Sequence, residues 1–403
     1  MEYTKDYFDQ VTDRTGTHCA KYDSMGMFFP GDNLVPMWIA DMEFRCPQEL
    51  IEAVRKRTEC GIYGYPELSG TAYHHFVVDW QRERNGIEYA EDDVFFGESA
   101  LTGVKLAIHA LAKEGEEVLM FLPTYGYFHK YVVNMGRVPV MPHLVHDENG
   151  YSIDFDALDA TLAEHDIKLL IFCSPFNPVG RVWTEEELTK LITICQKHGV
   201  PIVSDEVHSD FIMPGHTFIP TASVARKLGY DQNVITTSSI SKTFNCAGIN
   251  AGYYIIHGEE MKAKIAASAT FFDASEMLGG FSYLALEQVY TENGSKYVDA
   301  LCSYVYDNYR YLCDRLVALP FADEIVVSDM QGTYLAWIQF KNYGEAERLT
   351  YEFCKHGVAL EDDEEFFEDE GHFIRFNLAA PRSVIEQAVE RTEACLKALY
   401  SAA

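Results

Sequence analysis

Residues 234–245 read VITTSSISKTFN and contain the most informative residue of the chain. The apolar, β-branched start predicts a buried strand over 234–238 that runs into Ser239. Lys242 is the only Asp, Glu, Lys or Arg between Asn233 and His257. A lysine alone in an apolar, hydroxyl-rich stretch is costly to bury charged, so its pKa should fall and leave a neutral amine able to attack a carbonyl. A lysine that reaches the surface is the competing interpretation.

A regular alternation of strands and helices surrounds this stretch. Short apolar runs bounded by turn residues predict strands, and helical spacing of apolar residues predicts helices between them. The expected strands are 94–96, 118–122, 168–173, 200–204 and 234–238, and the expected helices are 101–112 and one that begins at the capping box Thr184–Glu187 and ends at Gly199. This alternation predicts an α/β fold whose mainly parallel sheet is covered by helices on both faces.

The pattern changes after about residue 290. Long apolar-periodic helices are expected over 297–318 and 384–399, beside short strands near 333–340 and 372–377. A chain of 403 residues also exceeds the usual size of a single core. We therefore expect a large domain over 46–290, a small α+β domain over 291–403, and an N-terminal segment, 1–45, that packs with the small domain.

The net charge and the cysteines of the chain limit its expected binding partners and its expected cellular compartment. The formal net charge of −30 disfavours nucleic acid and anionic membranes, because both are bound through Lys and Arg. The ten cysteines include no Cys-x-x-Cys pair, which is typical of reduced thiols in a cytosol. The chain shows neither a secretory signal nor an apolar run of about 20 residues that could span a membrane. We expect a cytoplasmic protein with no membrane or nucleic-acid partner.

Polar residues follow several of the expected strands. In parallel sheets ligands bind beyond the carboxyl ends of the strands, and Asn177, Asp205 and Lys242 all lie just past such ends. An aspartate there can pair with a protonated pyridine nitrogen. It can also cap the next turn, or bind a metal with His208 and Asp210. No metal site is expected, because the chain has neither a His-Glu-x-x-His motif nor a Cys/His set.

Other candidates carry weaker signals. Residues 99–103 open a helix after a strand, and helix N-termini offer free N–H groups to phosphate. Tyr125 can stack on an aromatic cofactor, although core packing is the more common role of a single tyrosine. Arg375, within the apolar run 373–377, suits bidentate capture of a carboxylate, and a surface-facing position is the alternative. The acidic stretch 361–370 is expected to be a solvated loop.

Taken together, six stretches resemble the fold-type-I, class I/II aminotransferase superfamily, and more closely its cystathionine β-lyase branch of C–S lyases. They occur in family order over nearly the whole chain, and the combination is specific. The stretches are 36–44 (PMWIADMEF), 61–65 (GIYGY), 174–183 (SPFNPVGRVW), 204–210 (SDEVHSD), 241–245 (SKTFN) and 375–382 (RFNLAAPR).

This resemblance implies a cofactor, pyridoxal 5′-phosphate (PLP), bound as a Schiff base to Lys242. It implies that Asp205 partners the pyridine nitrogen, that Asn177 and His208 face the ring O3′, and that Tyr125 stacks on the ring. The implied phosphate ligands are Ala100, Leu101 and Ser239, joined by Tyr65 from a neighbouring subunit of a homodimer. Arg375 would take the substrate α-carboxylate, with Ala40 at the substrate loop. The chain departs from many class I enzymes in having Asn250 where they carry a phosphate-binding arginine, and Glu98-Ser99 where Pro-Gly is usual.

The activity implied is C–S β-elimination from L-cystathionine or a related cysteine S-conjugate, which yields a thiol, pyruvate and ammonia. Lys242 would take the Cα proton. An aminotransferase would use the same lysine, aspartate and arginine, so the sequence leaves that reading open. A PLP-fold regulatory protein with little turnover is the non-enzymatic alternative.

Overall fold

The structure, a computed structural model, describes residues 3–66, 73–147, 150–274, 278–342, 348–369 and 371–402. Its centre is a seven-stranded sheet with the strand order β2-β10-β9-β8-β7-β3-β4. The strands are β2 (Val94–Gly97), β3 (Glu117–Leu119), β4 (Val138–Val140), β7 (Ile167–Cys173), β8 (Ile202–Asp205), β9 (Val234–Ser239) and β10 (Gly252–Ile256). The pairs from β4 to β9 are parallel, whereas β10 runs antiparallel to both β9 and β2. The mainly parallel sheet predicted from the sequence is confirmed.

Helices flank this sheet, as expected. α5 (Ala100–Leu111) packs against β7 to β10, and α9 (Thr221–Lys227) packs against β9 and α8 (Glu185–His198). α8 has the predicted ends: Thr184 and Glu187 form a reciprocal capping box, and Gly199 stops the helix at a φ of 70°. The other helices of this part of the chain are α3 (Gln48–Glu59), α4 (His74–Asn85), α6 (Gly126–Asn134), α7 (Phe155–Glu164), α10 (Ile240–Thr243), α11 (Glu259–Phe271) and α12 (Gly280–Val289).

A second, four-stranded antiparallel sheet lies in the C-terminal part, with the order β11-β12-β15-β14. Its strands are β11 (Ile325–Val327), β12 (Leu335–Phe340), β14 (Glu361–Asp362) and β15 (Phe373–Asn377). Its helices are α13 (Glu292–Val317), α14 (Leu349–Lys355) and α15 (Arg382–Ala402). α13 begins five residues before the predicted start, because the Thr291 hydroxyl caps the N–H of Gly294. β12 begins two residues late, because Thr333 has a left-handed φ of 69°.

The N-terminal segment lies against the C-terminal part. β1 (Val35–Pro36) pairs in parallel with β13 (Val358–Ala359), and α1 (Lys5–Phe8) contacts α13. This pairing supports the boundaries that we predict at residues 45 and 290, which stay predictions. The remaining elements are α2 (Ala20–Asp23), the hairpin of β5 (Val145–Asp147) and β6 (Gly150–Ser152), and short 3-10 turns.

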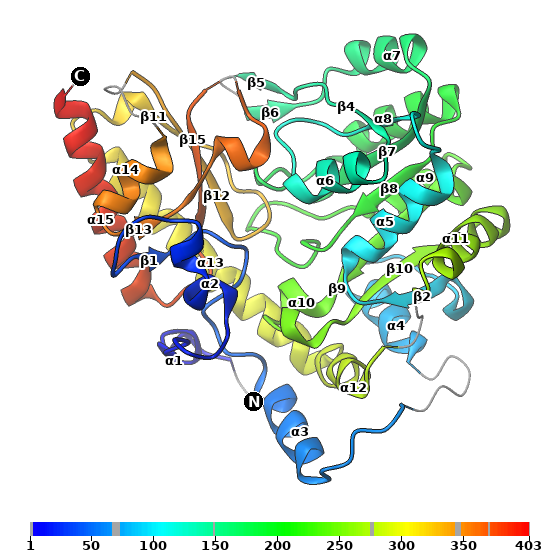
Figure 1. Ribbon diagram of the computed structural model, residues 1–403, viewed down its shortest axis with the longest axis horizontal. Coiled ribbons are helices and arrows are strands. Elements are labelled where there is room, and N and C mark those ends of the chain that lie inside the picture. The colour runs from blue at the N-terminus through cyan, green and yellow to red at the C-terminus, as the bar shows by residue number, and fades with distance from the viewer. Residues whose placement is uncertain are drawn as a thin grey trace.

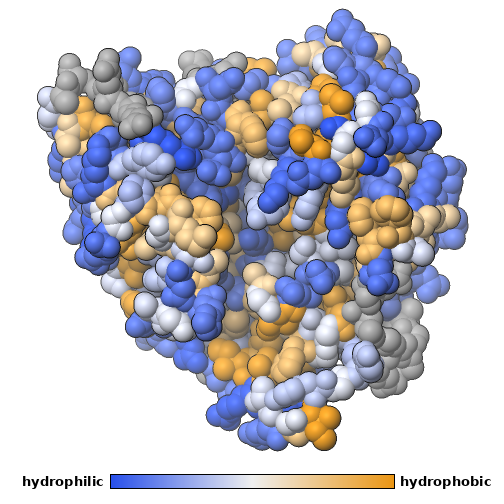
Figure 2. Space-filling model, in the orientation of Figure 1, coloured by the Kyte–Doolittle hydropathy of each residue, from blue (hydrophilic) through white to orange (hydrophobic). Residues whose placement is uncertain are grey.

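The two sheets lie side by side, with α10 between them (Figure 1). In the same orientation the surface is hollowed between the C-terminal part on the left and the seven-stranded part on the right (Figure 2). Among the described residues, no helix combines the length and the apolar character that crossing a membrane requires.

Candidate active site

Lys242 lies on α10, one turn after β9 ends. Its Nζ donates a hydrogen bond of 2.6 Å to the carbonyl oxygen of Ala40, 202 positions earlier in the chain. Burial, followed by repulsion from Arg375, lowers the pKa of Lys242 to about 8. A substantial fraction of its amine is therefore neutral near pH 8, as the isolated position in the sequence predicted.

Asp205 ends β8, the neighbour of β9. It is 4% exposed, and the backbone N–H of Val207 donates to its Oδ1 at 3.1 Å. Burial raises the pKa of Asp205 to about 6, while the nearby Lys242 lowers it. A positively charged partner would therefore stabilise the ionised form of this buried carboxylate.

Arg375 lies on β15 with 3% of its surface exposed, so it does not face the solvent. Its Nη1 donates to Asn177 Oδ1 at 3.0 Å, and its Nη2 donates to the carbonyl of Trp38 at 3.1 Å. Nη2 also forms an ion pair with Glu361. Because Asn177 accepts through Oδ1, its amide NH₂ is left to donate to another group. Arg375 and Asn177 thus come together although 198 positions separate them.

His208 is buried beside Tyr334, whose ring centroid lies 5.7 Å away. Nδ1 of His208 has no hydrogen-bond partner among the described residues. Burial, with help from Lys242 and Arg375, lowers the pKa of His208 well below its ordinary value, so the ring is neutral. A buried ring nitrogen without a partner indicates that a polar group belongs next to it.

The N-terminus of α5 approaches the same end of the sheet. Ala100 and Leu101 begin this helix, and the first amides of a helix have no acceptor within it. A Cβ on Gly252 would lie 2.3 Å from the carbonyl carbon of Ser99, so only glycine lets β10 come this close. Ser239 ends β9 beside this helix end; its hydroxyl donates to the Ala251 carbonyl at 2.9 Å and caps the N–H of Ser241.

Tyr125 precedes α6 and faces the same cluster. Burial raises the pKa of its hydroxyl, and the charges of Arg375, Asp205 and Glu361 all act on it. These charge effects indicate that the Tyr125 hydroxyl lies near these side chains, while its ring packs against Tyr127 and Phe128. Tyr65 lies elsewhere: it follows α3 and is 91% exposed. Asn250 is exposed as well, with a left-handed φ of 50°.

The segment around Ala40 closes the cluster on one side. Its carbonyl accepts from Lys242 and, at 3.0 Å, from the Tyr334 hydroxyl. The amide of Asn377 donates to the carbonyls of Ile39 and Asp41, at 2.8 and 3.0 Å. The buried Lys21 Nζ holds the next turn through the Asp41 carbonyl (2.7 Å) and Glu43 (2.7 Å). The segment is therefore tied both to the lysine and to the four-stranded sheet.

We call two sides of this cluster the seven-strand wall (Asn177, Asp205, His208 and Lys242) and the four-strand wall (Glu361 and Arg375). The residues present fit PLP. A carboxylate can partner the ring nitrogen, an unpartnered His208 nitrogen and a free Asn177 amide can meet the ring oxygen, and a glycine-lined helix N-terminus suits a phosphate. The chain has Asn250 where many class I enzymes carry a phosphate-binding arginine, so the candidate phosphate donors are the first backbone amides of α5 and the Ser239 hydroxyl.

Two residues of the site, Tyr334 and Glu361, are not identified from the sequence. Tyr334 gave no signal beyond an apolar strand. Glu361 was assigned to a solvated acidic loop, which is wrong for the first two residues of that stretch: Glu361 and Asp362 form β14, and Asp362 is 1% exposed. Glu361 lies directly opposite Arg375 in the strand register. An acidic residue two positions beyond the buried pair Val358–Ala359 was the available clue.

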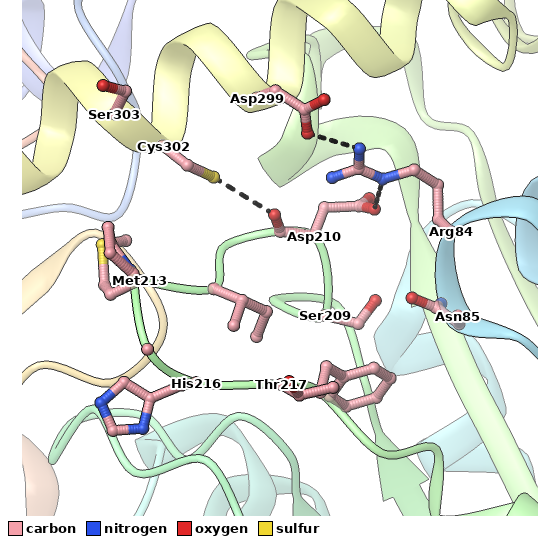
Figure 3. A pocket seen from close by; sticks show the side chains of 14 residues that line it. Arg84, Asn85, Ser209, Asp210, Met213, His216, Thr217, Asp299, Cys302 and Ser303 are labelled. Carbon is pink, nitrogen blue, oxygen red and sulfur yellow. Dashed lines mark hydrogen bonds and ion pairs between the residues drawn. The ribbon is translucent and has the colours of Figure 1, made fainter.

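A separate hollow of about 420 Å³ lies between the end of α4, the loop after β8 and α13, and contains none of the predicted site residues. Arg84 stands there between Asp210 and Asp299, at 3.8 and 2.6 Å (Figure 3). Asp210 accepts at 2.7 Å from Thr243, the residue after Lys242. Arg84, Asp210 and Asp299 thus neutralise one another, and Asp210 ties this group to the helix that carries Lys242. Elsewhere, His143, Glu368 and Asp369 place ligand-type atoms within 4.8 Å of one another, apart from this cluster.

This sheet, with a partly buried lysine and a buried aspartate at adjacent strand ends, defines the class of fold-type-I PLP-dependent enzymes. The model of the family "Aminotransferase class I and II" matches residues 37–391, and the chain belongs to this family. The resemblance stated from the sequence is confirmed.

Similar proteins include enzymes named as C–S lyases and enzymes named as aminotransferases. The chain is 32% identical to cystathionine β-lyase PatB of Bacillus subtilis, over 96% of this chain and 99% of that one. It superimposes with a TM-score of 0.88 on the PLP-bound C–S lyase of Staphylococcus hominis, at 29% identity and 98% coverage of both chains. A PLP-bound putative aminotransferase of Clostridium difficile 630 gives a TM-score of 0.90 at 31% identity, covering 96% and 99% of the two chains.

Proposed function

We propose that this protein is a PLP-dependent C–S β-lyase that cleaves L-cystathionine or a related cysteine S-conjugate to a thiol, pyruvate and ammonia. The observation that carries the proposal is the amine of Lys242, which has a pKa of about 8 and lies in a cluster with Asp205 and Arg375. The name of PatB, cystathionine β-lyase, supports the substrate class.

Each wall has its own task in this proposal. When bound, PLP supplies a pyridinium ring that accepts electrons from the substrate. Asp205 would partner the ring nitrogen, Asn177 and His208 would face the ring oxygen, and Tyr125 would pack against the ring. Ala100, Leu101 and Ser239 would hold the phosphate, and Lys242 would be the attachment point.

The four-strand wall binds the substrate. Arg375, which already donates through Nη1 and Nη2, takes the α-carboxylate. Ala40 lies at the substrate loop, where its carbonyl orients the Lys242 amine. Lys242 Nζ then takes the Cα proton as a general base, and the thiolate leaves from Cβ.

A homodimer completes the proposal. Ile62, Tyr63 and Tyr65 are 72%, 60% and 91% exposed in one continuous segment, which supports burial against a second copy. Tyr65 would there reach the phosphate of the partner's cofactor. A cytoplasmic location stays a prediction.

The test supplies L-cystathionine to the purified holoenzyme with no keto acid present. We expect pyruvate, followed by coupled lactate dehydrogenase, and thiol, followed with a disulfide dye, in equal amounts. Activity that appears only after 2-oxoglutarate is added would establish an aminotransferase, the reading that the Clostridium difficile neighbour favours. Purified protein without PLP absorbance and without turnover of either kind would favour a regulatory protein, whereas full turnover by Lys242→Ala would remove Lys242 from the chemistry.

A further inference from the structure

Arg375 is already paired with a carboxylate of its own chain. Glu361 on β14 faces Arg375 on β15 across the antiparallel pair, and the two side chains form an ion pair. The guanidinium is 3% exposed, and the Glu361 side chain is 18% exposed. The face of the arginine is covered by Phe366, whose ring centroid lies 4.6 Å from Cζ. Of its three nitrogens, Nε has no partner among the described residues.

Glu361 therefore lies inside the cluster. Its negative charge raises the pKa of Lys242, on the seven-strand wall, and the pKa of Tyr125. It occupies the position in which a substrate carboxylate would meet Nη2 of Arg375. Asn177 and the Trp38 carbonyl, the other partners of this arginine, are uncharged. Glu361 is thus the carboxylate that an incoming carboxylate must displace or share.

Two carboxylates on one partly desolvated guanidinium repel each other, and one of them gains a proton most readily. We propose that Glu361 competes with the substrate carboxylate for Arg375 and takes up one proton from solvent as the substrate binds. Once protonated, Glu361 no longer forms an ion pair with Arg375. The guanidinium then pairs with the carboxylate of the ligand. Glu361 is in this way a positioning residue that sets substrate affinity and its pH dependence. The inference rests on the proposed role of Arg375.

The groups around Glu361 favour this protonation. Burial raises its pKa, Arg375 and more weakly Lys242 lower it, and Glu365 and Asp362 raise it again. A ligand carboxylate that takes Arg375 away removes the largest lowering effect. The acid form is then favoured at higher pH than in the free enzyme, so binding weakens as the pH rises between the two pKa values.

The probe is 3-(methylthio)propionate, which carries a carboxylate and a thioether but has no amine to react with the cofactor. Its dissociation constant is measured by titration calorimetry on the holoenzyme between about pH 6 and pH 8, in buffers of different ionisation enthalpy. Glu361→Gln keeps the size and removes the charge. Glu364→Gln is the matched control, because Glu364 belongs to the same acidic stretch but is 63% exposed and paired with Arg348.

We expect the natural protein and Glu364→Gln to take up about one proton and to bind more weakly as pH rises. Glu361→Gln should bind about tenfold more tightly at pH 8 with little proton uptake. Equal affinity and equal proton uptake in Glu361→Gln, while Arg375→Met abolishes binding, would overturn the role of Glu361 alone. Unchanged binding by Arg375→Met would instead overturn the carboxylate site, and with it this part of the proposed function.

Discussion

The seven-strand wall and the four-strand wall hold their polar groups by different means. Asp205 and Lys242 follow neighbouring parallel strands, and the register of β8 and β9 fixes where both chains emerge. Arg375 instead stands within an antiparallel strand, where its cross-strand partner Glu361, a side-chain amide and a carbonyl of the N-terminal segment hold it.

The difference predicts two kinds of mutational effect. The pKa values on the seven-strand wall are set mainly by burial, which no single neighbour supplies. The four-strand wall relies on charge pairs that a ligand can exchange. Changes on the first wall should therefore lower kcat, and changes on the second should mainly raise KM.

Lys242→Ala tests the first wall most severely. Removing the amine removes both the cofactor attachment and the base, so we expect kcat for pyruvate release to fall by about 10³-fold or more. Steady-state assays with L-cystathionine measure kcat. Lys190→Ala, which removes an exposed amine on α8, is the control. A variant that kept a tenth of the activity would show that another group takes the proton.

Asp205→Asn separates activity from stability. Loss of the charge at the ring nitrogen should lower kcat by about 10²-fold. The pKa of Asp205 is raised from 3.8 to about 6 in the folded state, so its contribution to stability is full below pH 4 and is lost as the pH rises through 6.

In cofactor-free protein we therefore expect Asp205→Asn to be more stable than the natural chain at pH 8, by up to about 3 kcal/mol, and equally stable near pH 4. Thermal unfolding at the two pH values measures this. A lower Tm at pH 8 would mean that the ionised carboxylate stabilises the empty site.

Arg375→Lys tests the second wall. A lysine cannot reproduce the forked donation to Asn177 and the Trp38 carbonyl. We expect KM for L-cystathionine to rise about 10- to 100-fold while kcat falls by less than about tenfold. A fall confined to kcat would place Arg375 in the chemistry and remove the contrast between the walls.

Tyr334→Phe should have the smallest effect. It removes one hydrogen bond of 3.0 Å to the Ala40 carbonyl but leaves the Lys242 bond to the same oxygen. We expect kcat/KM to fall about fivefold, the equivalent of about 1 kcal/mol. Tyr309→Phe, which loses a similar bond to the carbonyl of Ser328, a residue outside the two walls, should leave kcat/KM unchanged. Equal loss in both variants would indicate a general effect of packing.

The sequence revealed the seven-strand wall more fully than the four-strand wall, for a physical reason. Lys242, Asp205 and Asn177 follow buried strands, and strand ends in a parallel sheet meet at one edge. Glu361 and Tyr334 depend on the pairing of β14 with β15 and on the course of the N-terminal segment, which no local pattern encodes. Strand β10 was not among the expected strands, and its antiparallel direction could not be predicted either, because periodicity shows a strand but not its direction. The proposed role of Tyr65 concerns a second chain, and no intrachain contact can test it.

The hydrogen bond between Ala40 and Lys242 also bears on the order in which parts of the fold can form while the chain is synthesised. The ribosome makes the 36–44 segment early, yet its partners Lys242 and Asn377 follow 202 and 338 positions later. The strands of the seven-stranded sheet are complete once residue 256 has emerged, so the nascent chain can assemble its lysine pocket first. The early segment must wait for the end of the chain before it closes that pocket. The contacts that we propose for the substrate, at Ala40 and Arg375, are therefore expected to form after the pocket around Lys242.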